Sequence, residues 1–319
     1  MTMLPASTTT SQLRTSVTAA FAYIYLAWGV TYMAVHFALQ SLPPFIMSGS
    51  RFFLAGWILL ALVGLFQRGQ FRWGTAGEWR DAAVIGTILL LGGNGSVAWA
   101  QQYVNTSNAA LLFGTIPLFI ILFEWLRPGG VRPSFRTGIG LLMGFAGLCI
   151  LIKPAPEVIH NGMEIWGKGV LLLGAVSWAV GAIYSRFHHA QGSPLLPMAR
   201  QMISGGTALL MVSVLHGDWQ GFSLGHVTLP SLCGFTYLTT FGSLLGFTAY
   251  SWLMRVSTPE RVSTVPYVNT VVAVLLGWAV GEPMSLRIVI GAVIIVASVV
   301  IVLKKKSVRD TFDATPTEA

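Results

Sequence analysis

The stretch GGNGSVAWAQQYVNTSNAALLFGTIPLFIILFEWL, residues Gly92–Leu126, decides how this chain folds. It consists of two apolar runs joined by a short polar linker, and it has no charged residue before Glu124. Polar side chains nevertheless interrupt the apolar runs. An unsatisfied polar group costs several kcal/mol in hydrocarbon, so we expect these side chains to face the interior of a helix bundle or a watery cavity.

A second version of this stretch lies further along the chain, at Gly242–Trp278: GSLLGFTAYSWLMRVSTPERVSTVPYVNTVVAVLLGW. Several residue pairs share one separation of 150 positions: Gly92 with Gly242, Trp28 with Trp178, Pro44 with Pro194, Arg51 with Gln201 and Gly56 with Gly206. One such pair would arise by chance, but five at the same offset indicate an internal duplication.

The composition indicates a membrane protein. The chain is 54% hydrophobic and 9% charged, whereas soluble domains have about 25% charged residues. Apolar runs near 20 residues recur along the sequence, each long enough to cross about 30 Å of hydrocarbon as a helix. We therefore predict an all-α polytopic membrane protein that lies in a lipid bilayer.

We predict ten transmembrane helices. They fall near residues 17–39, 45–66, 82–101, 106–126, 135–152, 167–187, 196–216, 230–254, 261–281 and 285–303. Residues 1–16 and 304–319 are predicted to be tails, and residues 153–166 connect the two halves. The connections are too short and too apolar for a separate soluble domain.

The basic residues predict the orientation, because cytoplasmic loops are enriched in Lys and Arg. If both tails lie in the cytoplasm, fourteen Lys and Arg residues lie inside and only Lys153, Lys168 and Arg287 lie outside. The net charge of +8 therefore reflects membrane topology. We expect no nucleic-acid partner.

Each copy of the duplicated unit holds an odd number of spans. Residues 17–152 hold five and residues 167–303 hold five. The second unit must therefore cross the membrane in the opposite sense to the first. Such an inverted repeat is typical of secondary transporters, whose substrate site lies near the bilayer midplane between the halves. We expect a multi-pass bacterial inner-membrane protein with both termini in the cytoplasm.

The order of short motifs resembles the drug/metabolite transporter superfamily, specifically its EamA type. The likeness covers residues 19–303, is closest to the ten-span YedA-like exporters and extends more distantly to aromatic amino-acid exporters. The motifs that support it are AWGVTY (Ala27–Tyr32), PPFIMSGSRFFLAG (Pro43–Gly56), GNG (Gly93–Gly95), TIPLF (Thr115–Phe119), SWAVGAIY (Ser177–Tyr184), FGSLLGFTAY (Phe241–Tyr250), YVNTVVAVLLG (Tyr267–Gly277) and GE (Gly281–Glu282).

The resemblance implies export of small metabolites or drugs by alternating access. It implies a cavity walled by the first, third, fourth, sixth, eighth and ninth spans. One departure concerns the ninth span, where Thr270 stands in place of the family's usual proline and Pro266 comes four residues earlier. A proline frees a backbone carbonyl and bends a helix, so we take Pro117 and Pro266 as the candidate hinges.

Residues that combine polarity or an aromatic ring with an intramembrane position are the candidates for the substrate cavity. Trp28 and Trp178 are predicted to wall it, although tryptophans also serve as packing residues or as anchors at the membrane interface. The hydroxyl and amide candidates have helix-to-helix hydrogen bonding as their alternative use. The full set is Tyr25, Trp28, Thr31, Tyr32, Asn94, Trp99, Gln101, Thr115, Trp178, Tyr184, Thr248, Tyr250, Tyr267 and Asn269.

Arg51 is the costliest residue to place, because an arginine at the centre of a span costs about 2.5–3.5 kcal/mol on insertion scales. It is either a carboxylate clamp or gate, or it snorkels toward the headgroups. For Arg200, nearer the end of its span, we expect snorkelling. For Glu124 we expect a solvated ion pair with Arg127 rather than a role as proton carrier.

The sequence predicts a secondary transporter for small amphipathic solutes, such as aromatic or apolar amino acids or neutral drugs. A passive channel is the alternative. An enzyme is disfavoured because no His-Glu-x-x-His, Asp-rich or P-loop motif occurs. We expect neither a cofactor nor a metal ion. The substrate, the driving force and the oligomeric state stay open.

Overall fold

The computed structural model describes residues 10–128, 132–152, 162–185, 193–257, 262, 265–282 and 284–303. Within these ranges the chain forms helices and their connections, without a strand. The prediction of an all-α protein is confirmed.

The described residues form ten helical rods, in agreement with the ten predicted spans. Seven of the rods are α1 (Thr10–Ala38), α2 (Pro44–Phe66), α7 (Phe135–Ile152), α8 (Met163–Ser185), α9 (Leu195–His216), α13 (Val265–Ala279) and α14 (Leu286–Leu303). The other three rods, which correspond to the third, fourth and eighth spans, are each assembled from more than one element. Short 3₁₀ turns, η1 (Arg68–Gln70) and η3 (Leu224–His226), lie in two of the connections.

The third and eighth spans contain a π-helix at the same place in each repeat. The third consists of α3 (Ala76–Gly86), η2 (Thr87–Gly95) and α4 (Ser96–Ala100). The eighth consists of α10 (Leu229–Tyr237), η4 (Leu238–Leu245) and α11 (Gly246–Val256). The central segments η2 and η4 are π-helical. Such segments are rare and frequently mark functional sites. The sequence did not predict them.

The fourth span is broken in its middle. Helix α5 (Thr106–Phe113) and helix α6 (Ile116–Leu126) are separated by Gly114 and Thr115. Pro117 lies in the first turn of α6, where a missing backbone N–H leaves no hydrogen bond unmade. Pro266 lies in the first turn of α13, near the end of that rod. The break next to Pro117 therefore has no described equivalent next to Pro266.

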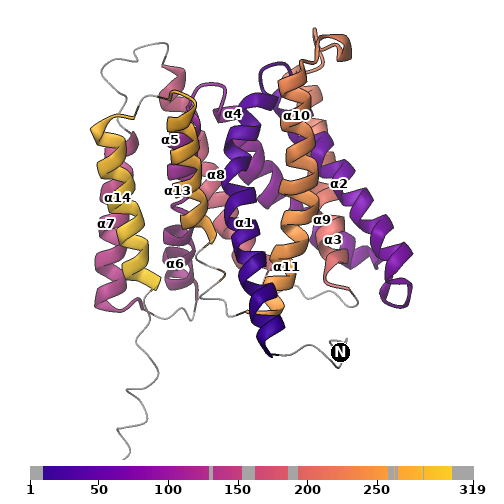
Figure 1. Cartoon of the computed structure of the whole chain (residues 1–319), viewed down its shortest axis with the longest axis horizontal. Coiled ribbons are helices and arrows are strands. Elements are labelled where there is room, and N and C mark those ends of the chain that lie inside the picture. The colour runs from indigo at the N-terminus through magenta and orange to yellow at the C-terminus, as the bar shows by residue number, and fades with distance from the viewer. Residues whose placement is uncertain are drawn as a thin grey trace, which may run out of the picture.

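The packing of the rods shows the inverted repeat. Helix α2 packs against its counterpart α9, and α7 packs against its counterpart α14. Helix α1 packs against α13 as α8 packs against α5 and α6. The start of α1 and the end of α14 lie at the same edge of the bundle (Figure 1). We call this edge the termini face, and the other edge, where α1 ends and α2 begins, the opposite face.

Two glycines at the repeat offset allow α2 and α9 to cross closely. A Cβ added at Gly56 would lie 2.8 Å from the backbone oxygen of Ala199, and one at Gly206 would lie 2.5 Å from the backbone nitrogen of Phe53. Neither position has room for a side chain. The matched pair Gly56 and Gly206 is thus explained by close helix packing, as in other membrane proteins.

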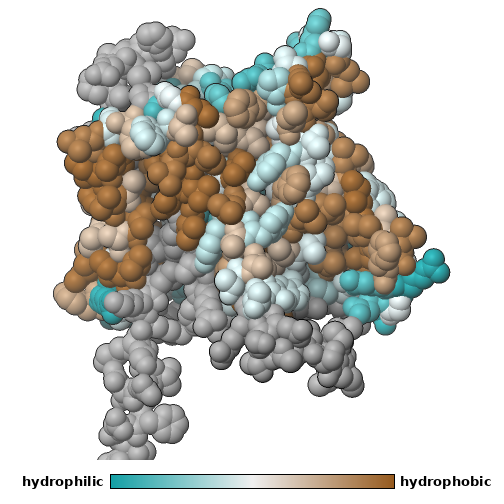
Figure 2. Space-filling model, in the orientation of Figure 1, coloured by the Kyte–Doolittle hydropathy of each residue, from teal (hydrophilic) through white to brown (hydrophobic). Residues whose placement is uncertain are grey.

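The outer surface of the bundle suits a lipid bilayer. Among the described residues, seven rods are long and apolar enough to cross a membrane, and α13 and α14 contribute shorter apolar helices. Hydrophobic residues cover much of the visible face, and hydrophilic residues gather at its upper and lower rims (Figure 2). Large apolar side chains such as Leu142 and Leu173 are 73% and 69% exposed on the outside. The chain is a multi-pass membrane protein.

Candidate substrate pathway

Trp28 on α1 binds the π-helix of the other repeat. Its indole Nε1 donates a hydrogen bond to the backbone oxygen of Gly242 at 2.9 Å. A side chain at Gly246, one turn further on, would collide with the same indole. Because glycine has no Cβ, the ring can lie directly against the backbone of η4 and α11.

Trp178 on α8 has the equivalent position against η2. A Cβ added at Gly93 would lie 2.7 Å from the Trp178 ring. The neighbouring Ser177 donates its hydroxyl to the backbone oxygen of Ile88 at 2.7 Å. The edge of the Trp178 ring also meets Phe113, with ring centres 5.8 Å apart. Each tryptophan therefore joins the first span of its own repeat to the π-helix of the other.

Aromatic rings extend this contact across the repeat interface. The Trp28 ring lies 5.3 Å from that of Tyr250 and 5.4 Å from that of Phe247. Phe247 in turn lies 6.5 Å from Phe52 on α2, in an edge-on arrangement. Trp28 and Tyr250 were predicted site residues, whereas Phe247 and Phe52 were not. The sequence prediction selected tryptophan, tyrosine and polar side chains, and it included no phenylalanine.

Arg51 points into the bundle, so the snorkelling alternative is wrong. Its side chain is 5% exposed. Its Nη2 donates to Oδ1 of Asn94 at 3.2 Å, and its guanidinium lies 4.2 Å from the centre of the Phe52 ring. Two polar residues that the sequence singled out separately, on the second and third spans, are thereby brought together.

The Arg51–Asn94 pair has hydrogen-bond donors without acceptors. Both Nε of Arg51 and Nδ2 of Asn94 are buried and bond to no protein atom. Within the described part of the chain no carboxylate forms an ion pair with Arg51. A buried donor left unsatisfied costs about 1–3 kcal/mol, and more when it is charged. Burying these unsatisfied donors therefore costs more free energy than a purely structural contact normally does.

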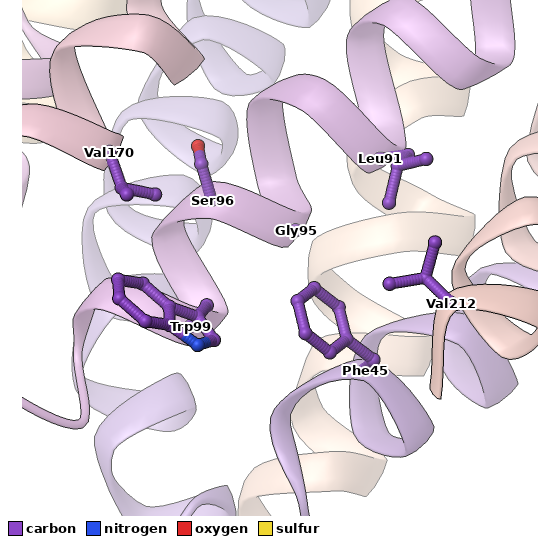
Figure 3. Close-up of a pocket in the computed structure, with 7 residues that line it drawn as sticks. All are labelled: Phe45, Leu91, Gly95, Ser96, Trp99, Val170 and Val212. Carbon is purple, nitrogen blue, oxygen red and sulfur yellow. The ribbon is translucent and has the colours of Figure 1, made fainter. Parts of the chain in front are cut away.

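A largely open pocket of about 270 Å³ adjoins Gly95, the chain neighbour of Asn94, and neither Arg51 nor Asn94 lines it. Figure 3 shows its walls, with Trp99, Ser96 and Val170 on one side and Phe45, Val212 and Leu91 on the other. Gly95, the residue that follows Asn94, completes the lining. Phe45 and Phe52 belong to one buried apolar cluster, against which Leu91 and Trp99 also pack. Of the lining residues only Trp99 was predicted. Ser96 was not singled out, and the other five are glycine or apolar residues that look like ordinary core.

Three predicted hydroxyls donate to backbone oxygens three or four residues earlier in the chain. Thr31 donates to the backbone oxygen of Trp28, Thr115 to that of Leu112, and Thr248 to that of Leu244 at 2.7 Å. Thr115 is fully buried. Hydroxyls bonded in this way contribute less to recognition of a substrate than free ones do.

Two predicted amides join helices. Gln101 donates to the backbone oxygen of Tyr32 at 3.0 Å. Oriented so that its nitrogen faces carbonyls, Asn269 donates to the backbone oxygens of Val265 and Tyr25 at 3.0 and 3.1 Å. Both amides therefore tie other spans to α1.

The predicted tyrosines take different positions. Tyr25, Tyr32 and Tyr184 are half-buried. Tyr32 packs against the apolar core formed by the fourth and sixth spans. The backbone of Tyr267 belongs to α13, but its side chain lies outside the described residues.

On the opposite face, acids of the second repeat hold helices of the first. The carboxylate of Glu282 accepts hydrogen bonds from the backbone nitrogens of Thr106 and Ser107, at 2.7 and 3.0 Å, and from the Ser107 hydroxyl at 2.7 Å. Asp218 accepts from the backbone nitrogens of Phe45 and Ile46, at 2.9 and 3.2 Å. Both carboxylates stabilise helix N-termini, where the helix dipole favours negative charge. The sequence did not predict either cap.

On the termini face, Arg200 does not snorkel, contrary to our expectation. Its side chain is 1% exposed. Its Nη2 donates to the backbone oxygen of Arg72 at 2.8 Å, and its Nη1 lies 3.5 Å from Oε1 of Glu78. Arg200 therefore holds the connection between α2 and α3 against α9. The expected Glu124–Arg127 ion pair is confirmed, with a distance of 2.8 Å.

The described residues contain no group of three or more His, Cys, Asp or Glu side chains that could hold a metal ion. They do contain a buried guanidinium bonded to an amide, several aromatic rings and an apolar pocket. Such a set of groups can bind and orient a small solute.

Comparisons with known proteins agree with this architecture. The profile of the EamA-like transporter family matches the chain twice, at residues 16–153 and 165–304. The uncharacterized inner membrane transporter YedA of Escherichia coli K12 is 35% identical over 285 residues, which cover 86% of this chain and 88% of that protein.

More distant relatives also align with most of the length of this chain. The uncharacterized transporter YoaV of Bacillus subtilis is 22% identical, over 85% of this chain and 91% of that protein. A protein crystal structure of 21% identity superposes with a TM-score of 0.61 and covers 90% of this chain and 96% of that one, which shows the fold alone. The double profile match and the identity to YedA show that this chain belongs to the EamA-like transporter family of membrane proteins.

Proposed function

We propose that this protein is a secondary transporter that exports small amphipathic metabolites, such as apolar or aromatic amino acids or drug-like solutes. The solute passes between the two repeats by alternating access. The observation that supports this best is the reciprocal contact of Trp28 with η4 and of Trp178 with η2. An inverted pair of units joined by equivalent contacts can rock between two conformations that expose opposite sides of one site.

The polar caps support a carrier more than an open channel. On the opposite face, the Glu282 and Asp218 caps join the two repeats. A carrier must break such contacts in each cycle, whereas a channel holds a continuous path. We take export as the direction from the resemblance to EamA-type exporters. The fourteen basic residues predicted for the inner side place both termini in the cytoplasm in this proposal.

Transport is tested with purified protein in liposomes preloaded with labelled L-phenylalanine, L-leucine or chloramphenicol. We expect release faster than from protein-free liposomes, saturation with substrate, and stimulation by unlabelled substrate on the other side. Saturation and countertransport identify a carrier, and linear release without countertransport identifies a channel. Release equal to that of empty liposomes for the whole panel contradicts the proposal.

Trp28→Ala tests the interface in the same assay. We expect at least about a tenfold slower release, because the variant loses the bond to Gly242 and the ring contacts with Tyr250 and Phe247. Trp166→Ala is the matched control, since Trp166 on α8 is 67% exposed on the outside of the bundle. Equal effects of the two substitutions on the release rate would contradict a role for Trp28 in transport.

A further inference from the structure

We propose that Arg51 and Asn94 form a binding site for the carboxylate of the transported solute. This inference rests on the proposed transport function and specifies the substrate class: small monocarboxylates with an apolar body. One carboxylate oxygen accepts from Nε of Arg51, and the other accepts from Nδ2 of Asn94.

The first step of the argument concerns charge. Arg51 is 5% exposed and keeps its positive charge, because arginine is not deprotonated in proteins. The Phe52 ring offers a favourable face at 4.2 Å but no negative charge. Within the described residues Arg51 makes one hydrogen bond, to a neutral amide oxygen. A buried cation of this kind calls for an anion.

The second step concerns the donors. The bond from Arg51 Nη2 fixes the oxygen of Asn94 toward the guanidinium, so the amide nitrogen must point elsewhere. That nitrogen and Nε of Arg51 are both buried and without an acceptor. An incoming group therefore has to accept two hydrogen bonds and supply negative charge. A carboxylate does both, since its two oxygens match paired N–H donors.

The third step concerns the size of the charge. Among the described buried basic residues Arg51 is the one without a carboxylate within ion-pair distance, although Arg200 also has buried donors, Nε and Nη1, that make no hydrogen bond. Lys168 forms an ion pair with Glu164 at 2.6 Å, and Arg200 donates to the backbone oxygen of Arg72 and lies 3.5 Å from Glu78. A single guanidinium neutralises a single negative charge. The arrangement therefore favours a carboxylate over a phosphate dianion, which requires more than one cation.

The fourth step concerns the body of the solute. The apolar cavity is lined by Gly95, which is bonded directly to Asn94, and by Phe45, which lies about 9 Å along α2 from Arg51. Its Ser96 hydroxyl is already bonded to the backbone oxygen of Gly93. Neither Arg51 nor Asn94 lines this pocket in the present conformation, so the proposal requires that the solute body reaches it when the two buried donors open. The pocket then offers rings and aliphatic groups for contact.

The two donor atoms are closed off from solvent in this conformation. The carboxylate accordingly enters when the repeats separate, and it replaces no existing ion pair. The π-helix η2, which presents Asn94 between Gly93 and Gly95, is the segment able to rearrange at that step.

The test compares matched ligands on the purified full-length protein. The probes are 3-phenylpropionate with its amide, and 4-methylpentanoate with its amide, at constant ionic strength. Binding is measured by the shift in thermal unfolding temperature with ligand concentration. We expect each acid to bind at least about 30-fold more tightly than its amide, because truncating one partner of a buried charged pair typically costs that factor or more.

Variants separate recognition from folding. Arg51→Gln and Asn94→Leu are expected to remove the preference for the acid, and Arg51→Lys to retain part of it. Asn94→Asp is expected to raise the unfolding temperature of the ligand-free protein and to weaken acid binding, since its own carboxylate would occupy the guanidinium. Arg200→Gln is the matched control, a buried arginine with protein partners, and is expected to leave the acid-to-amide ratio unchanged.

Equal binding of acid and amide, no stabilisation by either acid, or an unchanged ratio in Arg51→Gln would overturn the carboxylate site. The efflux assay with chloramphenicol, which has no carboxylate, distinguishes failure of the carboxylate site from failure of the transport proposal. Release of chloramphenicol without any acid preference refutes only the carboxylate site. No release of any solute refutes transport itself.

Discussion

Three buried or half-buried side chains, Arg51, Trp28 and Arg200, show how individual residues connect the helices of this protein. Arg51 and Trp28 both reach across helices, one to Asn94 and the other to the backbone of Gly242. Arg200 has the same chemistry as Arg51 but finds a backbone carbonyl and a carboxylate within the protein. The difference between the two arginines is therefore one of partners, since both are almost fully buried.

Arg200→Gln is predicted to loosen the connection between α2 and α3. The variant loses the bond to the backbone oxygen of Arg72 and the contact with Glu78, so Arg68 and Arg72 become better protease sites. Limited trypsin digestion of the detergent-solubilised protein, followed by mass spectrometry, measures the rate of cleavage after them. Arg80→Gln, at an arginine whose side chain is 76% exposed, is the control. Identical digestion of both variants and the wild type would contradict this role.

At the scale of elements, the break in the fourth span and the two π-helices depart from regular α-helix. Thr270 on α13 contacts the broken span: its hydroxyl lies 3.2 Å from the backbone oxygen of Ala110 and 2.8 Å from that of Pro266. A side chain at Gly114 would meet the same hydroxyl. The threonine at the family's usual proline position is thus accommodated by a cross-helix contact beside the break.

Gly206→Ala is predicted to destabilise the contact between α2 and α9. The added methyl group would lie 2.5 Å from the backbone nitrogen of Phe53, which cannot move without displacing the helix. Overpacking of this kind costs about 1–3 kcal/mol. The free energy of unfolding, measured by denaturant titration in mixed micelles, should fall by that amount.

Gly169→Ala provides the control for this substitution. Gly169 also lies within a helix, α8, but an added Cβ would have no neighbour within 4 Å. We expect an unchanged or slightly higher stability, because alanine is the better helix former. Equal losses of stability at Gly169 and Gly206 would show that close packing is not the cause.

For the whole molecule, two inverted five-helix units pack together, and acids and an arginine hold the connections at the two faces of the bundle. The Glu282 and Asp218 caps act at the opposite face, and Arg200 acts at the termini face. Because the start of α1 and the end of α14 lie at one edge of the bundle (Figure 1), we expect both tails on the same side of the membrane. The distribution of Lys and Arg predicts that this side is the cytoplasmic one.

Reporter fusions test this orientation. A green fluorescent protein fused to either terminus should fluoresce, and alkaline phosphatase fused to either terminus should be inactive, because the first folds in the cytoplasm and the second needs an oxidising compartment for its disulfides. Termini reported on different sides would contradict the inverted repeat. Both termini outside would contradict only the proposed orientation.

The sequence by itself determined the class, the ten spans and the duplication, because hydrophobic length and periodic repetition are local properties of the chain. It also selected Arg51, Asn94, Trp28 and Trp178, since polar and aromatic groups within apolar runs are costly to place without a partner.

Only the tertiary structure decided which of these residues meet. It showed that Arg51 faces Asn94, that Gln101 and Asn269 tie helices together, and that apolar residues such as Phe45 and Phe247 line the interior. The physical reason is that a polar side chain in a membrane helix can satisfy its hydrogen bonds within its helix, across to a neighbour or on a solute. That choice depends on what the other helices place beside it.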